Sequence, residues 1–279
     1  MTVNTTAAIN NPSPLAAAHI VRRGDVTLEV LDQGSGPLVV MLPSLGRAAQ
    51  DFDAIAARMA TAGFRVLRPQ PRGIGRSRGA MTGIDLHDLS NDIAAVIEEA
   101  DAGAAFVVGH AFGNRVSRLL ATDRPDLVRG ISLIAANVGI APSPPVVREA
   151  IRKSANPALP DDERIAALQF AFFAPGNDAR SWLAGWHPDV LTMERVAGDR
   201  TSRDEDYAGG TAPILYLQPD HDPLAHADDA IAFKQAIGDR VTIITIPHAS
   251  HAAIAEQPDF IADALIDYAR RLPVQPQVV

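Results

Sequence analysis

A carboxylate and a histidine follow the last two apolar runs of the sequence. Asp222 comes after the run at 213–217, and His251 comes after the run at 241–246. A carboxylate that orients an imidazole makes a general base, which can take a proton from a hydroxyl, a water or an acidic C–H group. These two segments therefore predict acid–base chemistry.

A third segment predicts a tight turn that could carry a nucleophile. Gly109-His110-Ala111-Phe112-Gly113 follows the apolar run at 105–108 and precedes a helical pattern. Two glycines that flank a central residue at a strand-to-helix turn form the G-x-S-x-G elbow, in which backbone strain exposes a serine hydroxyl. The central residue here is Ala111, which has no nucleophilic atom.

Apolar runs alternate with helical patterns along most of the chain. Strands are expected at 26–31, 37–42, 64–67, 105–108, 131–134, 213–217 and 241–246, and helices at 51–62, 86–100, 114–122, 227–237 and 259–272. This alternation predicts an α/β protein with a mostly parallel sheet. Ligands of such sheets bind beyond the carboxyl ends of the strands, which is where all three segments lie.

One long stretch lacks strand signals. Residues 141–210 are helix-like throughout, and we expect a helical insertion that covers the carboxyl edge of the sheet. Its aromatic side chains either form a plain core or line an apolar pocket. The candidates for the pocket are Phe172, Phe173, Trp182 and Trp186.

The chain order of these segments resembles that of the α/β-hydrolase superfamily. Nucleophile position, acid and histidine follow one another, each after a strand. The resemblance runs from about residue 18 to about residue 272 and implies an α/β-hydrolase core at 19–140 and 211–279, with a helical cap at 141–210. Residues 1–18 are expected to be a flexible N-terminal arm.

The resemblance implies roles for the acid and the histidine. The family's acid closes a G-x-x-D pattern, which places it at Asp222 with Pro219 where the glycine stands; Asp220 is the alternative. His251 is followed by Glu256-Gln257-Pro258, which fits the Glu-x-Pro that the family carries after its histidine.

Two loops match the family with changes. Residues 72–77 read R-G-x-G-x-S, although Gln70 stands where an Asp is usual. The oxyanion loop, usually His-Gly, reads Pro-Ser-Leu-Gly at 43–46. Because Pro43 has no N–H group, the resemblance assigns the oxyanion donors to the N–H groups of Leu45 and Phe112.

The remaining polar candidates have simpler explanations. His110 is expected to pack beneath the elbow, although it and Ser44 are also candidates for the substrate pocket, and Ser44 could supply a substitute hydroxyl. His248 is expected to be a polar residue at a strand end. His221 and His226 lie five residues apart with Pro223 between them, which does not favour a zinc site.

Composition narrows the classes of function. The chain has 279 residues, a formal net charge of −8 and no cysteine. The acidic balance disfavours nucleic acid as a partner, and no apolar run is long enough for a transmembrane helix. We expect a cytoplasmic enzyme with a small-molecule substrate, no metal and no organic cofactor.

The predicted activity is hydrolysis of a small acyl compound, such as a carboxylic ester or a lactone. Ala111 then marks an engineered inactive form or a natural variant. The alternative is a non-hydrolytic enzyme that uses the Asp222–His251 pair, or a ligand-binding pseudoenzyme on the same fold. Epoxide hydrolases and haloalkane dehalogenases are disfavoured because their elbow carries a carboxylate.

Overall fold

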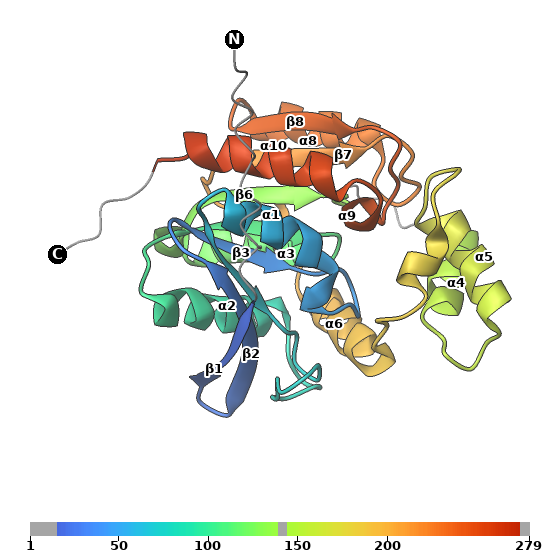
Figure 1. Ribbon diagram of the computed structural model, residues 1–279, viewed down its shortest axis with the longest axis horizontal. Coiled ribbons are helices and arrows are strands. Elements are labelled where there is room, and N and C mark those ends of the chain that lie inside the picture. The colour runs from blue at the N-terminus through green and yellow to red at the C-terminus, as the bar shows by residue number, and fades with distance from the viewer. Residues whose placement is uncertain (1–15, 139–143, 274–279) are drawn as a thin grey trace, which may run out of the picture.

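Eight strands form one sheet in the computed structural model, which describes residues 16–138 and 144–273. The strand order is β1-β2-β4-β3-β5-β6-β7-β8. The first two strands are antiparallel to their neighbours, and all pairs from β4 to β8 are parallel. The expected mostly parallel α/β sheet is confirmed (Figure 1).

The strands are β1 (Ala17–Arg23), β2 (Val26–Gly34), β3 (Leu38–Leu42), β4 (Arg65–Pro69), β5 (Ala105–His110), β6 (Val128–Ile134), β7 (Ile214–Pro219) and β8 (Val241–Ile246). The helices are α1 (Asp53–Thr61), α2 (Leu86–Ala100), α3 (Gly113–Asp123), α4 (Pro145–Ser154), α5 (Asp161–Ala171), α6 (Pro188–Arg200), α7 (Arg203–Tyr207), α8 (Ala227–Ile237), α9 (Ala253–Glu256) and α10 (Pro258–Arg271). None of them, within the described ranges, is long and apolar enough to cross a membrane.

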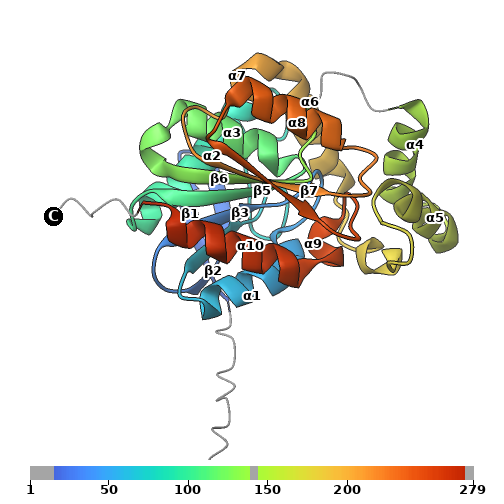
Figure 2. The ribbon, with the colours of Figure 1, turned by 90° about the horizontal axis from the view of Figure 1, so that it is seen from above.

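Two apolar cores cover the two faces of the sheet. Val39 and Met41 of β3 belong to the core under α1 and α10, whereas Val40 and Leu42 belong to the core under α2, α3 and α8. Figure 2 shows α1 and α10 on one side of the sheet and α2, α3 and α8 on the other. Because alternate residues of β3 serve opposite cores, the strand reads as a continuous apolar run.

The strand β1 was not expected from the sequence. It pairs only with β2 at the sheet edge, and Val21 is its one fully buried residue. An edge strand needs little apolar sequence, so periodicity does not reveal it. Ala17 and Ala18 of the expected N-terminal arm lie in this strand, and residues 1–15 fall outside the described residues.

Where it is described, the segment between β6 and β7 contains helices and loops but no strand. It contains α4, α5, α6 and α7, and a short 3₁₀ turn at Ala179–Trp182. In Figures 1 and 2, α4 and α5 lie to one side of the sheet, beyond the carboxyl ends of the parallel strands. This is the edge at which the loops after β3, β5, β7 and β8 emerge.

Candidate active site

The turn between β5 and α3 has the backbone of a nucleophile elbow. Ala111 has φ 49°, in the left-handed region that costs an L-residue about 1–2 kcal/mol. A Cβ on Gly109 would lie 2.5 Å from backbone atoms of Gly113, and a Cβ on Gly113 would lie 2.4 Å from the carbonyl oxygen of Leu42. Both flanking positions therefore require glycine, and they bring the oxyanion loop against the elbow.

Hydrogen bonds fasten the elbow to the neighbouring strand. The N–H of Ala111 donates to the carbonyl of Ile134 at 3.0 Å. The side chain of Asn114 donates to the same carbonyl at 2.9 Å and accepts from the N–H of Ile134 at 3.2 Å. The strained turn is held in place with a methyl group where a hydroxyl would stand.

His110 lies buried beneath the elbow, and its Nε2 donates to the carbonyl of His251 at 2.7 Å. Burial, helped by the neighbouring His251, lowers the pKa of His110 to about 3. The ring is therefore neutral near pH 7, and it connects the elbow to residues 247–252, the histidine loop, which carries His251. This is a packing role, as the sequence led us to expect.

Asp222 and His251 form the expected pair. Asp222 Oδ2 lies 2.9 Å from His251 Nδ1. Asp222 Oδ1 accepts from the N–H groups of Leu224 and Ala225 at 2.8 and 3.1 Å. Because the carboxylate accepts from Nδ1–H, Nε2 of the neutral ring is the nitrogen left to act as a base. The contact is confirmed, whereas its catalytic role stays a prediction.

Asp220, the alternative acid, contacts a different set of groups. Its carboxylate accepts from the N–H groups of His248 and Ala249 at 3.0 and 3.1 Å and pairs with His221 Nδ1 at 2.6 Å. His248 itself has φ 52° and occupies a turn after β8. Asp220 therefore stabilises the histidine loop through these hydrogen bonds, and it is also the partner of the His221 imidazole.

Glu256 ties the histidine loop to the helical insertion. Its Oε2 accepts from the N–H of Ser250 at 2.6 Å, beside His251. Its Oε1 accepts from the N–H of Ala174 and from the Asn177 side chain, both at 2.7 Å. In the sequence, Glu-x-Pro serves only to identify His251 as the family's histidine. The structure shows what the carboxylate of Glu256 does: it links the histidine loop to the helical insertion.

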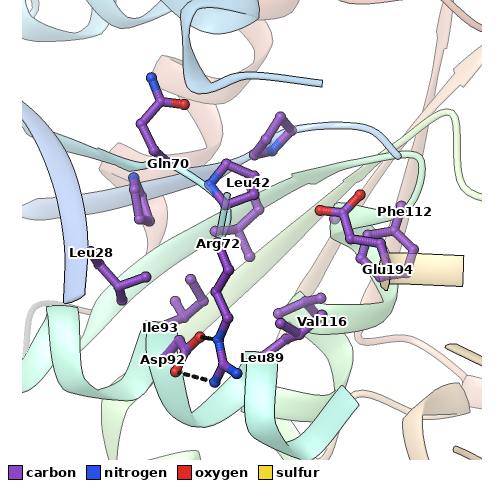
Figure 3. Close-up of a pocket in the computed structure, with 14 residues that line it drawn as sticks. Leu28, Leu42, Gln70, Arg72, Leu89, Asp92, Ile93, Phe112, Val116 and Glu194 are labelled. Carbon is purple, nitrogen blue, oxygen red and sulfur yellow. Dashed lines mark hydrogen bonds and ion pairs between the residues drawn. The ribbon is translucent and has the colours of Figure 1, made fainter. Parts of the chain in front are cut away.

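The R-G-x-G-x-S loop has a structural role. Arg72 pairs with buried Asp92 at 2.6 and 2.9 Å (Figure 3). Ser77 Oγ donates to the carbonyl of Gln70 and accepts from the N–H of Glu29, both at 2.9 Å. The Gln70 side chain, in place of the usual Asp, accepts from the N–H of Ala49 at 3.0 Å.

The candidate oxyanion donors are the backbone N–H groups of Leu45 and Phe112. Among the described residues, neither group has a hydrogen-bond acceptor. The next residue, Gly46, is held on both sides by the insertion: its N–H donates to Glu194 Oε2 at 2.7 Å, and its carbonyl accepts from the N–H of His187 at 2.9 Å. The oxyanion loop is thus positioned from outside the sheet.

Glu194 was not expected in the site from the sequence. Its side chain lies beside Phe112 in Figure 3, and burial raises its pKa to about 8. No sequence signal distinguishes this residue from an exposed helical glutamate, because its partner is a backbone N–H in a distant loop.

The four aromatic candidates lie together above the site. Phe172, Phe173 and Trp182 are buried, and Trp186 is half-buried. The Phe172 ring lies 5.7 Å from that of His251, and the Trp182 ring lies 5.8 Å from that of His110. They pack on one another as a core, and the insertion thereby covers the histidine.

Two cavities flank α6. A small one of about 50 Å³ includes Phe112, Arg72 and Glu194 in its lining (Figure 3). A larger one of about 830 Å³ lies between α4 and α6 and reaches Leu45. The linings of these two cavities do not include Ser44, His110 or the four aromatic residues, so contact of those six with a substrate stays a prediction.

Comparison with known sequences gives a family match and two long relatives. The family model described as serine aminopeptidase, S33, matches residues 35–258. The 2-(acetamidomethylene)succinate hydrolase of Mesorhizobium japonicum is 25% identical over 277 residues, which cover 91% of this chain and 97% of that protein. The sn-1-specific diacylglycerol lipase of Mus musculus is 24% identical over 281 residues, which cover 91% of this chain and 85% of the lipase.

Solved structures share the fold. The structure of E-2-(acetamidomethylene)succinate hydrolase matches with a TM-score of 0.74 at 21% identity, over 91% of this chain and 99% of that one. Epoxide hydrolase A from Mycobacterium thermoresistibile matches with a TM-score of 0.69 at 20% identity, over 93% of this chain and 100% of that one. At these identities the likeness concerns the fold alone.

Proposed function

Because the chain belongs to the serine aminopeptidase S33 family of α/β hydrolases, we propose that its site is built to hydrolyse a small acyl compound, such as a carboxylic ester, a lactone or a related bond. The observation that carries the proposal is the 2.9 Å contact between Asp222 and His251 at the edge that also holds the strained Ala111 turn. In this proposal His251 is the general base, and the N–H groups of Leu45 and Phe112 are the oxyanion donors for a nucleophile at position 111.

With serine at position 111, each group has a defined task. The hydroxyl oxygen attacks the acyl carbon while His251 Nε2 takes its proton, and Asp222 stabilises the imidazolium that forms. The N–H groups of Leu45 and Phe112 donate to the developing oxyanion. His251 then gives the proton to the leaving group, and a water repeats the sequence on the acyl-enzyme.

With Ala111, the acyl-enzyme cannot form, and this residue favours a second candidate function. The Asp222–His251 pair remains intact, so His251 can act as a general base on a bound water or on an acidic C–H group of the substrate. In this form the elbow only positions the substrate, and the helical insertion acts as a cap that keeps bulk water from the pair.

The substitution Ala111→Ser separates the two candidates. A triad serine is worth on the order of 10⁶ in kcat, so the serine form should gain at least about 10³-fold in hydrolysis of small activated esters. It should also react with a fluorophosphonate, detected as a mass increase on the peptide that contains residue 111.

The control is the double variant Ala111→Ser/His251→Ala, which should neither hydrolyse nor label. If the folded serine form does neither, the acyl-enzyme mechanism is wrong. If the Ala111 chain already turns over the esters as fast as the serine form, the second candidate replaces it.

A further inference from the structure

We propose that the cavity between α4 and α6 binds a carboxylate group of the substrate, so that the compound cleaved is an acyl compound with a free acid at its far end. This rests on the proposed function for the reacting group, but its evidence comes from a separate part of the molecule. The cavity has a volume of about 830 Å³, within the range of small-molecule sites.

The cavity begins at the oxyanion loop. Leu45, whose N–H is a candidate oxyanion donor, is half-buried and forms part of the lining. Ile151 of α4 and Leu191 of α6 add apolar surface. A substrate whose carbonyl oxygen meets the Leu45 N–H therefore has an adjacent space for the rest of its acyl chain.

Cationic side chains surround that space. Arg148 and Arg152 of α4 and Arg195 of α6 line the cavity, together with one carboxylate, that of Glu149. Arg152 is paired with Glu149, at 3.0 Å from its Nε. Among the described residues, Arg148 and Arg195 have no carboxylate partner. Two uncompensated cations therefore face one cavity in a protein with a formal net charge of −8.

This charge pattern favours an anionic ligand with an apolar portion. Guanidinium groups donate to a carboxylate in charge-assisted hydrogen bonds, which are about twice as strong as neutral ones. Cavity walls of low polarity concentrate the field of the cations on a bound anion. A neutral, wholly apolar acyl chain would leave both arginines unused.

Lys153 provides a matched control on the same helix. It lines a different groove, between α4 and α5, together with Ala167 and Phe170. A variant at Lys153 therefore removes one positive charge from α4 without touching the cavity.

Calorimetry on the full chain with Ala111 tests the binding without any turnover. The probes are glutarate, its dimethyl ester and inorganic phosphate. We expect glutarate to bind at least about tenfold more tightly than the diester and than phosphate. Arg148→Gln/Arg195→Gln should weaken glutarate binding by at least about tenfold, whereas Lys153→Gln should change it less than about twofold.

The proposal is overturned if glutarate shows no binding at 10 mM, roughly the weak limit for a charge-assisted pair. It is also overturned if the diester or phosphate binds as tightly, or if Lys153→Gln weakens binding as much as the double variant.

A kinetic arm keeps this result separate from that of the proposed function. In the Ala111→Ser protein, the double arginine variant should raise KM for the 4-nitrophenyl half-ester of glutarate by about tenfold with kcat little changed, and leave 4-nitrophenyl butyrate unaffected. Equal effects on both esters would refute the carboxylate site while hydrolysis itself stood.

Discussion

The elbow and the acid–histidine pair lie at the same edge of the sheet, but different forces hold them. The elbow is a backbone structure: a left-handed Ala111 and glycines that have no room for a Cβ. The pair is a side-chain structure, because Asp222 is fixed by two backbone N–H groups and in turn fixes His251.

The difference explains how the site can lack its nucleophile and keep its shape. The strained turn does not depend on the side chain at position 111, since Gly109, Gly113 and the Asn114 contacts determine it. His251, the proposed general base, is in contrast oriented by a single carboxylate, that of Asp222. Changes on the two sides should therefore have different consequences.

The largest effect is expected from a change in the acid–histidine pair. In the Ala111→Ser protein, Asp222→Asn should lower kcat/KM for ester hydrolysis by about 10²–10⁴-fold, because the amide neither holds the Nδ1–H tautomer nor stabilises the imidazolium. Steady-state kinetics on one activated ester measures it. The control is Asp220→Asn, two residues away and without contact to His251, which should cost less than about tenfold. Equal losses would show that Asp222 is not the catalytic acid.

The second effect concerns Glu194, whose carboxyl group accepts a hydrogen bond from the N–H of Gly46 in the loop beside the elbow. Burial raises the pKa of Glu194 from 4.5 to about 8. Between these values the unfolded chain releases the proton and the folded chain keeps it, so stability falls as pH rises from about 4.5 to 8 and then levels off. At about 1.4 kcal/mol per pH unit, the fall is at most ~5 kcal/mol.

Thermal unfolding at pH 5 and pH 8 checks this sign. Glu194→Gln should remove most of the fall in Tm, because the amide does not titrate; burial also raises the pKa of Glu256, so a smaller fall remains. Glu205→Gln removes an exposed carboxyl whose pKa is lowered by its hydrogen bond to His87, and that variant should keep the fall. A fall of undiminished size in Glu194→Gln would mean that another group causes it.

At the elbow, the largest effect on the free energy of unfolding should come from the addition of a single methyl group. Gly113→Ala places a Cβ 2.4 Å from the carbonyl oxygen of Leu42 and should cost about 3 kcal/mol in the free energy of unfolding. Gly83→Ala, where φ is +76° but nothing lies within 4 Å, should cost about 1 kcal/mol from strain alone. Urea unfolding of both variants compares them. A loss at Gly113 smaller than the expected one would show that the oxyanion loop moves to make room for the new Cβ.

The smallest effect is expected at the nucleophile position itself. Ala111→Gly relieves about 1–2 kcal/mol of left-handed strain and adds about 0.5–1 kcal/mol of chain entropy to the unfolded state. The net change should be a gain of between about 0 and 1.5 kcal/mol. Ala166→Gly, at an exposed position of α5, should instead lose about 1 kcal/mol. Destabilisation at Ala111 would mean that its methyl group packs in the site.

The fold was largely predictable because its signals are local. Buried strands such as β3 and β5 read as apolar runs, and α2 and α8 begin and end where their patterns do. The edge strand β1 escaped detection because only one of its residues is fully buried. The family match confirms the resemblance that the three loop motifs indicated.

The site was only partly predictable. The choice of Asp222 over Asp220 followed from a family spacing, and the structure bears out the contact with His251. Glu194 and the arginines of the cavity were not singled out. Arg148 and Arg195 lie on different helices, and helical periodicity indicates only that both are on exposed faces.

The sequence by itself determined the alternation of strands and helices along the chain apart from the edge strand β1, the strained elbow without a nucleophile, and the residues able to act as acid and base. Each of these depends on neighbours within a few positions, whose steric and hydrogen-bonding preferences act locally. Only the tertiary structure decided what holds the oxyanion loop and which charges share the cavity. Glu194 meets Gly46 across 148 positions of the chain. Such a contact arises from how whole helices pack, which no short stretch of sequence specifies.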